Sequence, residues 1–431
     1  MTRSLHVLVL GLNYAPEPTG IAPYTTGFAR FLAEAGHDVH VVTGFPHYPD
    51  WKLPHDYPGR RVRQFDGDVR LTRLRLPIPK TPTGRSRIAL EAAFALQAAA
   101  IRGPRPDVVI AVSPALLGVA ATLRWRFSAT PVGVIVQDLY SRALEETGSL
   151  GGRGIALAAW LERSLLRRAD GVAAIHDSFR RSLVGLGIDE QRITTIRNWT
   201  HVGEAVTDLP ELRTRLGWRD DEAIALYAGN MGAKQGLENV VDAARCADQQ
   251  RLPIRFVLLG SGNQKARLQE CARGVERLQF LDPLPGGEFE RALAAADVLV
   301  LNERPEVAEM CVPSRLTSYL AAARPVLAAT SVRSAATFEI VSSGGGRCIP
   351  PEEPQALLDA ALLMADDASG GLEMGARGRA FARSTLTGAA ARAGYLEWVE
   401  RLAAGQDAPE LVPRPRVGDT RTAEVSGGRP S

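Results

Sequence analysis

The sequence has few of the residues that build metal centres and disulfide frameworks. Its 431 residues include four cysteines and seven histidines. The cysteines lie far apart, at positions 246, 271, 311 and 348, with no Cys-x-x-Cys pair. Such spacing excludes a zinc ribbon and gives no sign of a disulfide framework. The histidines lack the H-x3-H spacing of a helical metal site. We therefore expect no protein metal cage and no cofactor.

Long hydrophobic runs are also missing. No uncharged stretch reaches the roughly 18 apolar residues of a membrane span, and the apolar run at residues 5–10 is too short for a signal-peptide core. Together with the cysteine pattern, this predicts a soluble protein in the cytoplasm.

Charge is unevenly distributed. Residues 1–200 contain 25 Lys and Arg against 17 Asp and Glu, and the excess is concentrated in residues 52–87. One interpretation is a solvated, arginine-rich surface. The other is peripheral contact with the anionic inner face of the cytoplasmic membrane. We expect no nucleic-acid partner.

Short β-branched segments alternate with helical patterns through most of the chain, which predicts parallel sheets covered by helices on both faces. The rhythm pauses near residue 200 and then restarts, so two α/β domains are expected. The expected strands are residues 5–10, 38–43, 107–112, 131–136, 171–175, 192–197, 223–229, 254–260, 277–281, 297–301 and 325–330. The proline-rich residues 44–85 are expected to form a long surface excursion.

The predicted boundaries follow from these shifts in pattern. They are an N-terminal domain, a linker, a C-terminal domain, a helical segment and a disordered tail, at residues 1–200, 201–221, 222–375, 376–404 and 405–431. Ligands of doubly wound domains bind beyond the carboxyl ends of the strands. The loops at those ends are therefore the candidate site.

The first such loop is GLNYAPEPTGIAPY, residues 11–24. It lacks the G-x-G-x-x-G pattern, which argues against a nicotinamide or flavin enzyme. Thr19 and Gly20 precede a predicted helix, where exposed backbone N–H groups suit an anionic group such as a diphosphate. The alternative is an ordinary strand-to-helix loop.

The second loop, YAGNMGAKQGLE, spans residues 227–238. Its glycines, Gly229 among them, let the backbone approach a ligand. Lys234 at a helix start is a candidate diphosphate clamp that neutralises a leaving group. No Lys-Ser/Thr pair follows, so this is not a Walker loop. A solvated lysine in a glycine-rich turn is the alternative.

A third loop covers residues 304–326. Pro313 is expected to begin a helix, with Ser314, Arg315 and Ser318 near its N-terminus, where the dipole favours phosphate. Arg315 suits a bidentate phosphate contact. The alternative is an ion pair with Glu309.

Three weaker candidates end other strands. Gly260 and Gly262 either admit a nucleotide base or form a turn. Asp138 either faces the cleft or caps the next loop.

These loops occur in an order that resembles a known family. Within a match that runs from about residue 5 to 400, the motifs are, in chain order, NYAPEPTGIAPYT, VVTGFPHYPDW, QDLY, RRADGVAAIHDSFRRSLVGLGI, IRNW, YAGNMGAKQGLE, FVLLGSG and PSRLTSYLAAARPV. They resemble glycosyltransferase family 4, and within it the colanic-acid-type fucosyltransferases. The resemblance implies the GT-B fold: two Rossmann-like domains facing across a cleft, with the last helix crossing back to the first domain.

The resemblance also assigns residues. It implies donor contacts at Gly20, Ile21, Gly229, Asn230, Lys234, Gly260, Gly262, Glu309, Pro313, Ser314, Arg315 and Ser318, and acceptor contacts at Asn13, Tyr14, Thr19 and Gly20. Asn230 stands where many members have an arginine. Ser318 occupies the place of the second Glu of the family's Glu-x7-Glu motif.

The resulting hypothesis is a retaining glycosyltransferase of exopolysaccharide or cell-surface glycan biosynthesis. Its donor is a nucleoside-diphosphate sugar, GDP-fucose first and a UDP-sugar second, and its acceptor a polyprenyl-diphosphate-linked saccharide. Lys234 and Arg315 would stabilise the leaving diphosphate and Asp138 would position the acceptor. The alternatives are a GT-B nucleotide-sugar 2-epimerase and a non-catalytic nucleotide-sugar-binding protein.

Overall fold

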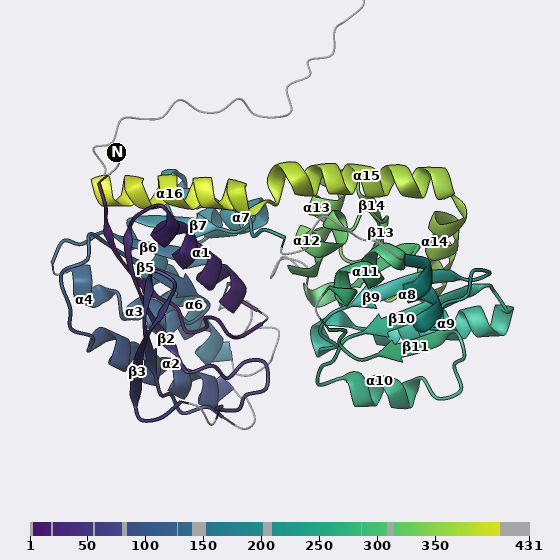
Figure 1. The fold of residues 1–431 in the computed structure, drawn as a ribbon, viewed down its shortest axis with the longest axis horizontal. Coiled ribbons are helices and arrows are strands. Elements are labelled where there is room, and N and C mark those ends of the chain that lie inside the picture. The colour runs from purple at the N-terminus through teal and green to yellow at the C-terminus, as the bar shows by residue number, and fades with distance from the viewer. Residues whose placement is uncertain are drawn as a thin grey trace, which may run out of the picture.

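A computed structural model gives the structure of the chain, which forms two lobes joined by long helices (Figure 1). The described residues are 3–18, 20–54, 57–79, 84–126, 128–139, 152–200, 209–285, 287–307 and 314–405. Three predicted site residues, Thr19, Glu309 and Pro313, lie outside them, as does nearly all of the predicted disordered tail.

The N-terminal lobe is built on an eight-stranded sheet in the order β3-β4-β2-β1-β5-β6-β7-β8. All neighbouring strands pair in parallel except β3 and β4, which are antiparallel. The strands are β1 (His6–Leu10), β2 (Asp38–Gly44), β3 (Arg61–Asp66), β4 (Val69–Leu74), β5 (Val108–Ser113), β6 (Val132–Val136), β7 (Gly171–Ala174) and β8 (Ile193–Thr195).

The hairpin of β3 and β4 corrects one expectation. Residues 44–85 were expected to be a surface excursion, yet β4 pairs with β2 and its side chains are largely buried. The prolines of this segment flank residues 61–74 and none lies within them. Because proline disrupts a ladder only inside a strand, the hairpin can extend the sheet.

Helices cover both faces of this sheet. α1 and the C-terminal α16 pack on one face, where Val7, Val9 and Ile110 join them in a buried cluster. The other face carries α2, α3, α6 and α7. The helices of the lobe are α1 (Ala22–Glu34), α2 (Gly84–Ala99), α3 (Leu116–Ala120), α4 (Leu123–Arg126), α6 (Gly152–Leu166), α7 (Asp177–Gly185) and the 3-10 turn η1 (Glu190–Arg192).

The C-terminal lobe contains a wholly parallel six-stranded sheet in the order β11-β10-β9-β12-β13-β14. Its strands are β9 (Ala223–Ala228), β10 (Ile254–Leu259), β11 (Leu278–Leu281), β12 (Val298–Asn302), β13 (Val326–Ala329) and β14 (Gly346–Ile349). Its helical elements are α8 (Leu209–Arg215), η2 (Ala233–Gln235), α9 (Glu238–Gln250), α10 (Lys265–Cys271), α11 (Glu288–Ala295), η3 (Pro305–Val307), α12 (Ser314–Ala321), α13 (Ala335–Ser343) and α14 (Pro354–Asp366).

Two helices run along one side of both lobes (Figure 1). α15 (Ala368–Thr385) packs on the C-terminal lobe, and α16 (Gly388–Ala404) returns to the N-terminal lobe. Trp398 of α16 is 1% exposed and lies against Gly133 and Gly171, where an added Cβ would approach its ring atoms to 2.7 and 3.1 Å. Two glycines under a tryptophan thus fix the helix on the sheet. The predicted returning C-terminal helix is present.

A polar cluster joins the lobes beside this crossover. Glu339 of α13 accepts a hydrogen bond from Arg197, which follows β8, and its Oε1 lies 2.7 Å from Nε2 of His176. Nδ1 of His176 accepts the backbone N–H of Ser178, 3.0 Å away, at the start of α7. Burial, assisted by the positive charge of Arg197, lowers the pKa of His176 to about 4. The imidazole is therefore neutral at physiological pH.

This burial predicts an acid-dependent loss of stability. The unfolded chain binds a proton at His176 near pH 6.5 and the folded chain only near pH 4. The free energy of unfolding should therefore fall as pH drops through that window. In His176→Gln this contribution disappears, so the loss between pH 7 and pH 5 should be smaller by about 2 kcal/mol than in the parent. Urea unfolding at both pH values measures it, and equal losses would contradict the assignment.

Candidate functional site

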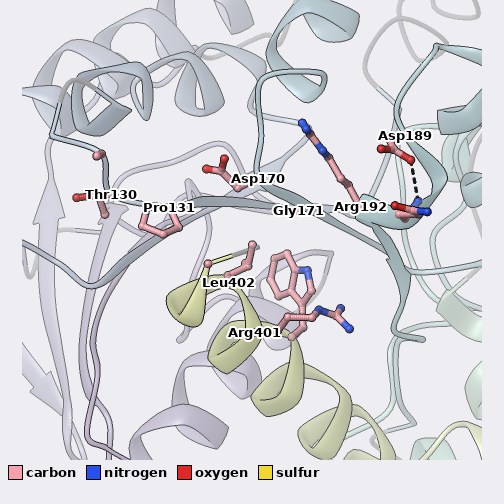
Figure 2. Close-up of a pocket in the computed structure, with 12 residues that line it drawn as sticks. Thr130, Pro131, Asp170, Gly171, Asp189, Arg192, Arg401 and Leu402 are labelled. Carbon is pink, nitrogen blue, oxygen red and sulfur yellow. Dashed lines mark hydrogen bonds between the residues drawn. The ribbon is translucent and has the colours of Figure 1, made fainter. Parts of the chain in front are cut away.

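One sizeable pocket lies away from the edge where ligands of parallel sheets bind. A pocket of about 620 Å³ lies at the amino ends of β6 and β7, beside α16 (Figure 2). Its polar side chains support nearby backbone: Asp170 accepts the N–H of Val132 at 2.8 Å and Asp189 that of Gln191 at 3.0 Å. Ligands of parallel sheets bind at the opposite, carboxyl edge.

At that carboxyl edge, the N-terminal lobe has a pocket of about 270 Å³. It lies where β1, β2 and β5 end, and its walls come from three loops and the first turns of α2. The lining residues are Leu12, Asn13, Gly20, Ile21, Thr25, His47, Tyr48, Trp51, Arg87, Leu90, Glu91, Val112, Pro114 and Ala115.

A buried carboxylate holds two of these loops together. Glu17, 5% exposed, accepts the side-chain N–H of Asn13 at 2.8 Å. Its other oxygen accepts the backbone N–H groups of His47 and Tyr48 at 2.8 and 3.0 Å. Because one carboxylate satisfies donors from both loops, the floor of the pocket is fixed before any ligand arrives.

Aromatic rings form one wall of the pocket. The rings of Tyr48 and Trp51 meet edge to face with centroids 6.2 Å apart. The guanidinium of Arg87 lies 5.3 Å from the Trp51 ring centroid. Glu91, one turn after Arg87 on α2, is buried and accepts the N–H of Leu117 at 3.3 Å. An aromatic face beside a cation and a carboxylate is chemistry that suits a polar ring compound carrying negative charge.

The predicted acceptor residues fall into different places. Asn13 and Gly20 line the pocket, as does the predicted donor residue Ile21, which caps α1. Tyr14 does not line it. Its ring is buried in the core and its hydroxyl donates to Asp66 at 2.8 Å. We therefore expect Tyr14 to support the loop and not to touch a ligand.

In the C-terminal lobe, the loops after β9 and β10 interlock through glycines. A Cβ added to Gly260 would lie 2.1 Å from the carbonyl oxygen of Gly229, and one on Gly262 would lie 2.4 Å from that of Met231. Both positions also have positive φ, +137° and +155°. Only glycine therefore allows the two backbones to meet. Asn230 lies at this contact, its side-chain oxygen 2.7 Å from the same Gly262 position.

Arg315 reaches this junction from the first turn of α12. Its guanidinium carbon lies 4.6 Å from the Tyr227 ring centroid and packs against Gly229. Nη1 is buried and has no hydrogen-bond partner among the described residues. An unsatisfied buried guanidinium N–H is costly, so an acceptor at this position would stabilise the arginine. Ion pairing with Glu309 lies outside the described residues.

Lys234 is held at the same edge by its backbone. It lies in η2, and its carbonyl accepts the N–H of Arg304 at 3.1 Å. Asn302 at the end of β12 donates to the carbonyls of Gln235 and Gly236 at 2.7 and 3.0 Å. The turn that carries the lysine is thereby attached to the end of a central strand.

Sequence reasoning missed Glu303, which lies between these groups. This carboxyl is 7% exposed and accepts hydrogen bonds from Thr330 at 2.6 Å and Ser334 at 2.9 Å. Burial raises its pKa, while those hydrogen bonds and the charges of Arg315 and Lys234 oppose the rise. The signal was available, since an acidic residue lies two positions after the end of the predicted strand 297–301.

The remaining predicted residues are Asp138, Ser314 and Ser318. Asp138 follows β6, where its side chain accepts the N–H of Leu139 at 3.0 Å, and it does not line the N-terminal pocket. Ser314 begins α12 as predicted, and Ser318 is half-buried one turn later. Within the described parts of the chain, no group of three or more His, Cys, Asp or Glu residues is placed to hold a metal.

Comparison with known proteins identifies the family. Residues 19–199 match the glycosyl transferase 4-like domain, and residues 222–367 match glycosyl transferases group 1. A protein of Escherichia coli K12 named as a colanic acid biosynthesis glycosyl transferase, WcaI, is 31% identical over 82% of this chain and 90% of its own. The chain belongs to this glycosyltransferase family. The family resemblance and the enzyme class predicted from the loops are thus confirmed.

A more distant relative is also a glycosyltransferase. A GDP-mannose-dependent alpha-mannosyltransferase of Mycobacterium tuberculosis is 26% identical over 75% of this chain and 79% of its own.

Solved structures confirm the GT-B architecture. The sucrose-phosphate synthase of Thermosynechococcus elongatus superposes with a TM-score of 0.70 at 18% identity, covering 93% of this chain and 99% of its own. Anabaena HepE in complex with UDP-glucose gives 0.65 at 16% identity, covering 91% and 99%. In the described residues, no helix of this glycosyltransferase is long and apolar enough to cross a membrane.

Proposed function

We propose that this glycosyltransferase binds a nucleoside-diphosphate sugar in its C-terminal lobe and transfers the sugar to a saccharide held in the N-terminal pocket. The observation that carries the proposal is Arg315, whose buried Nη1 has no hydrogen-bond partner in the part of the chain that the structure describes and lies beside a glycine-lined backbone junction. Lys234 approaches the same edge on its tethered turn. Two cations beside close-approach glycines suit a diphosphate.

The chemistry follows from this placement. As the bond from the sugar's anomeric carbon to the β-phosphate oxygen breaks, negative charge develops on the departing diphosphate. Lys234 and Arg315 stabilise that charge without reorganising. The acceptor hydroxyl forms the new bond to the anomeric carbon, and its proton passes to a phosphate oxygen. This route needs no protein base and favours retention of configuration.

The second sheet is our proposed donor domain, residues 222–375, and the first our acceptor domain, residues 1–200, linked by residues 201–221. The helical segment 376–404 connects them, and residues 405–431 form a tail. The donor we favour is GDP-fucose or a similar GDP-sugar, with a UDP-sugar second. The GDP-mannose-dependent relative supports the first base and the UDP-glucose complex the second.

The N-terminal pocket favours a saccharide acceptor. Sugar rings present apolar C–H faces, which stack on aromatic rings such as Tyr48 and Trp51. Arg87 beside Trp51 would pair with phosphate, as a polyprenyl-diphosphate-linked acceptor requires. The relative named for colanic acid biosynthesis supports a role in exopolysaccharide synthesis. Asp138 remains our candidate for positioning the acceptor.

We further propose peripheral contact with the inner face of the cytoplasmic membrane through residues 52–87. Arg60, Arg61 and Arg63 of this segment are exposed, which supports a long-range attraction to anionic lipid. Not every basic residue of the segment contributes. Arg73 is buried between Tyr14 and Tyr57, and Arg70 pairs with Asp38 at 2.7 Å.

Removing the lysine tests the donor half of the proposal. Lys234→Ala should lower kcat/KM for the nucleotide sugar at least 100-fold, because the leaving diphosphate loses a stabilising cation. Lys234→Arg should recover part of the activity. Arg273→Ala removes a distant exposed charge of the same lobe and should have no effect. Radiolabelled sugar transfer measures all three, and parent-like activity of Lys234→Ala would contradict the proposal.

Removing the aromatic wall tests the acceptor half. Trp51→Ala should raise KM for the acceptor about tenfold, the loss of roughly 1.4 kcal/mol of stacking, and leave KM for the donor unchanged. Trp51→Phe keeps a ring and should remain near the parent. Initial rates with each substrate varied separately give both constants. A rise in KM for the donor alone would show that the pocket binds the donor and would contradict the proposal.

A further inference from the structure

The outer face of α6 has an unusual composition. Leu157 and Trp160 lie one turn apart on this helix and are 64% and 63% exposed. Large apolar side chains on a soluble surface usually stand singly. Here two are adjacent, at a spacing that points both to the same side of the helix.

Arginines surround this apolar pair. Arg153 lies one turn before Leu157 on the same face, and Arg163 and Arg167 follow Trp160. All three are exposed, and none forms an ion pair with any residue that the structure describes. The helix has a single acidic residue, Glu162, and it points inward at 1% exposure. The outer face is therefore apolar at its centre and wholly cationic around it.

The opposite face of α6 packs against the protein core, so Leu157 and Trp160 remain on the outside. Leu165 and Leu166 pack into the cluster formed with β6, β7 and α7, and Leu161 packs against its edge. The buried and exposed residues form two opposite stripes with the helical period. A comparable pair in the other lobe, Phe338 and Val341, differs because Arg181 and the His176 ring cover Phe338.

We propose that the outer face of α6 is the membrane-docking surface of the enzyme and that its partner is an anionic phospholipid bilayer. Tryptophan and leucine insert at the headgroup boundary, while arginines pair with lipid phosphates. Charge alone gives weak, reversible attraction, and stable binding needs a second, apolar contribution. The α6 face supplies it from two adjacent side chains, whereas residues 52–87 add charge and the exposed ring of Phe65.

The order of the elements places one end of α6 near the carboxyl edge of the sheet. α6 follows β6 in the chain and precedes β7, so its first turn, with Arg153, lies toward the carboxyl edge of the sheet. The candidate acceptor pocket opens at the same edge. Docking would bring that pocket close to the bilayer surface, where a lipid-linked saccharide is presented. The inference deepens the proposed membrane contact and rests on it for its biological meaning.

Vesicle flotation of the full chain tests the surface without donor or acceptor. The parent should bind vesicles of phosphatidylglycerol and phosphatidylcholine but not of phosphatidylcholine alone. Leu157→Ser with Trp160→Ser should weaken binding at least tenfold, and Arg153→Glu with Arg167→Glu similarly. Leu363→Ser with Leu372→Ser changes two equally exposed leucines of the C-terminal lobe, 55% and 63%, and should bind like the parent.

Several results would overturn the proposal. One is that the parent does not bind the anionic vesicles. Another is that the Leu157/Trp160 variant binds them like the parent. A third is that vesicle binding is lost only when Arg60, Arg61 and Arg63 are neutralised. A dimer that the Leu157/Trp160 variant dissociates would instead make this face an interface between copies. Sugar transfer to a soluble acceptor should be unchanged in that variant, so failure of docking and failure of the transferase reaction are separately visible.

Discussion

A close contact between two backbone loops in the C-terminal lobe determines what its carboxyl edge can bind. Where Gly260 meets the carbonyl of Gly229, any side chain would collide. The two loops therefore lie against each other with their peptide groups near the edge, and Arg315 packs directly on the Gly229 backbone. No side chain can enter this contact, so the cationic groups that the edge presents are the buried guanidinium of Arg315 and Lys234 on its tethered turn. These are groups suited to phosphate oxygens.

A second constraint couples this edge to the other lobe. α12, which carries Arg315, also contributes Leu316, Thr317 and Leu320 to a narrow contact with the N-terminal lobe. The same contact contains the cluster of His176, Arg197 and Glu339. A change in the relative position of the lobes would therefore be transmitted to Arg315, which we propose as a donor contact. α16 is fixed on the first sheet by Trp398. Closure around two substrates would exclude water from the reacting centre.

The fold could be predicted from the sequence because its signal is repeated: β-branched strands alternate with helices in both halves. The hairpin of β3 and β4 was missed because flanking prolines dominate the local composition, while the pairing that buries β4 comes from β2. The glycine loops, Lys234 and Arg315 could be proposed from the sequence because their chemistry lies in residue type and position after a strand.

Other parts of the site depend on contacts between distant segments. Glu17 joins its own loop to His47 and Tyr48, and Glu303 is defined by Thr330 and Ser334. The aromatic wall of Tyr48 and Trp51 appears only once the loop after β2 folds over α1. Tyr14 shows the reverse error, since its place in a motif suggested a ligand contact but its hydroxyl binds Asp66. Contacts of this kind, between residues far apart in the sequence, cannot be predicted from the spacing of residues along the chain.

The central claim is that a nucleoside diphosphate binds at the glycine junction through Arg315. Thermal unfolding with GDP, UDP and dTDP, each without magnesium, in the parent and in Arg315→Leu, tests it most directly. A ligand at about 100 times its dissociation constant adds about 2.7 kcal/mol of stability, which is readily measured. The account predicts that one nucleotide stabilises the parent and that the variant loses this response. No response in the parent, or an equal response in both proteins, would contradict it.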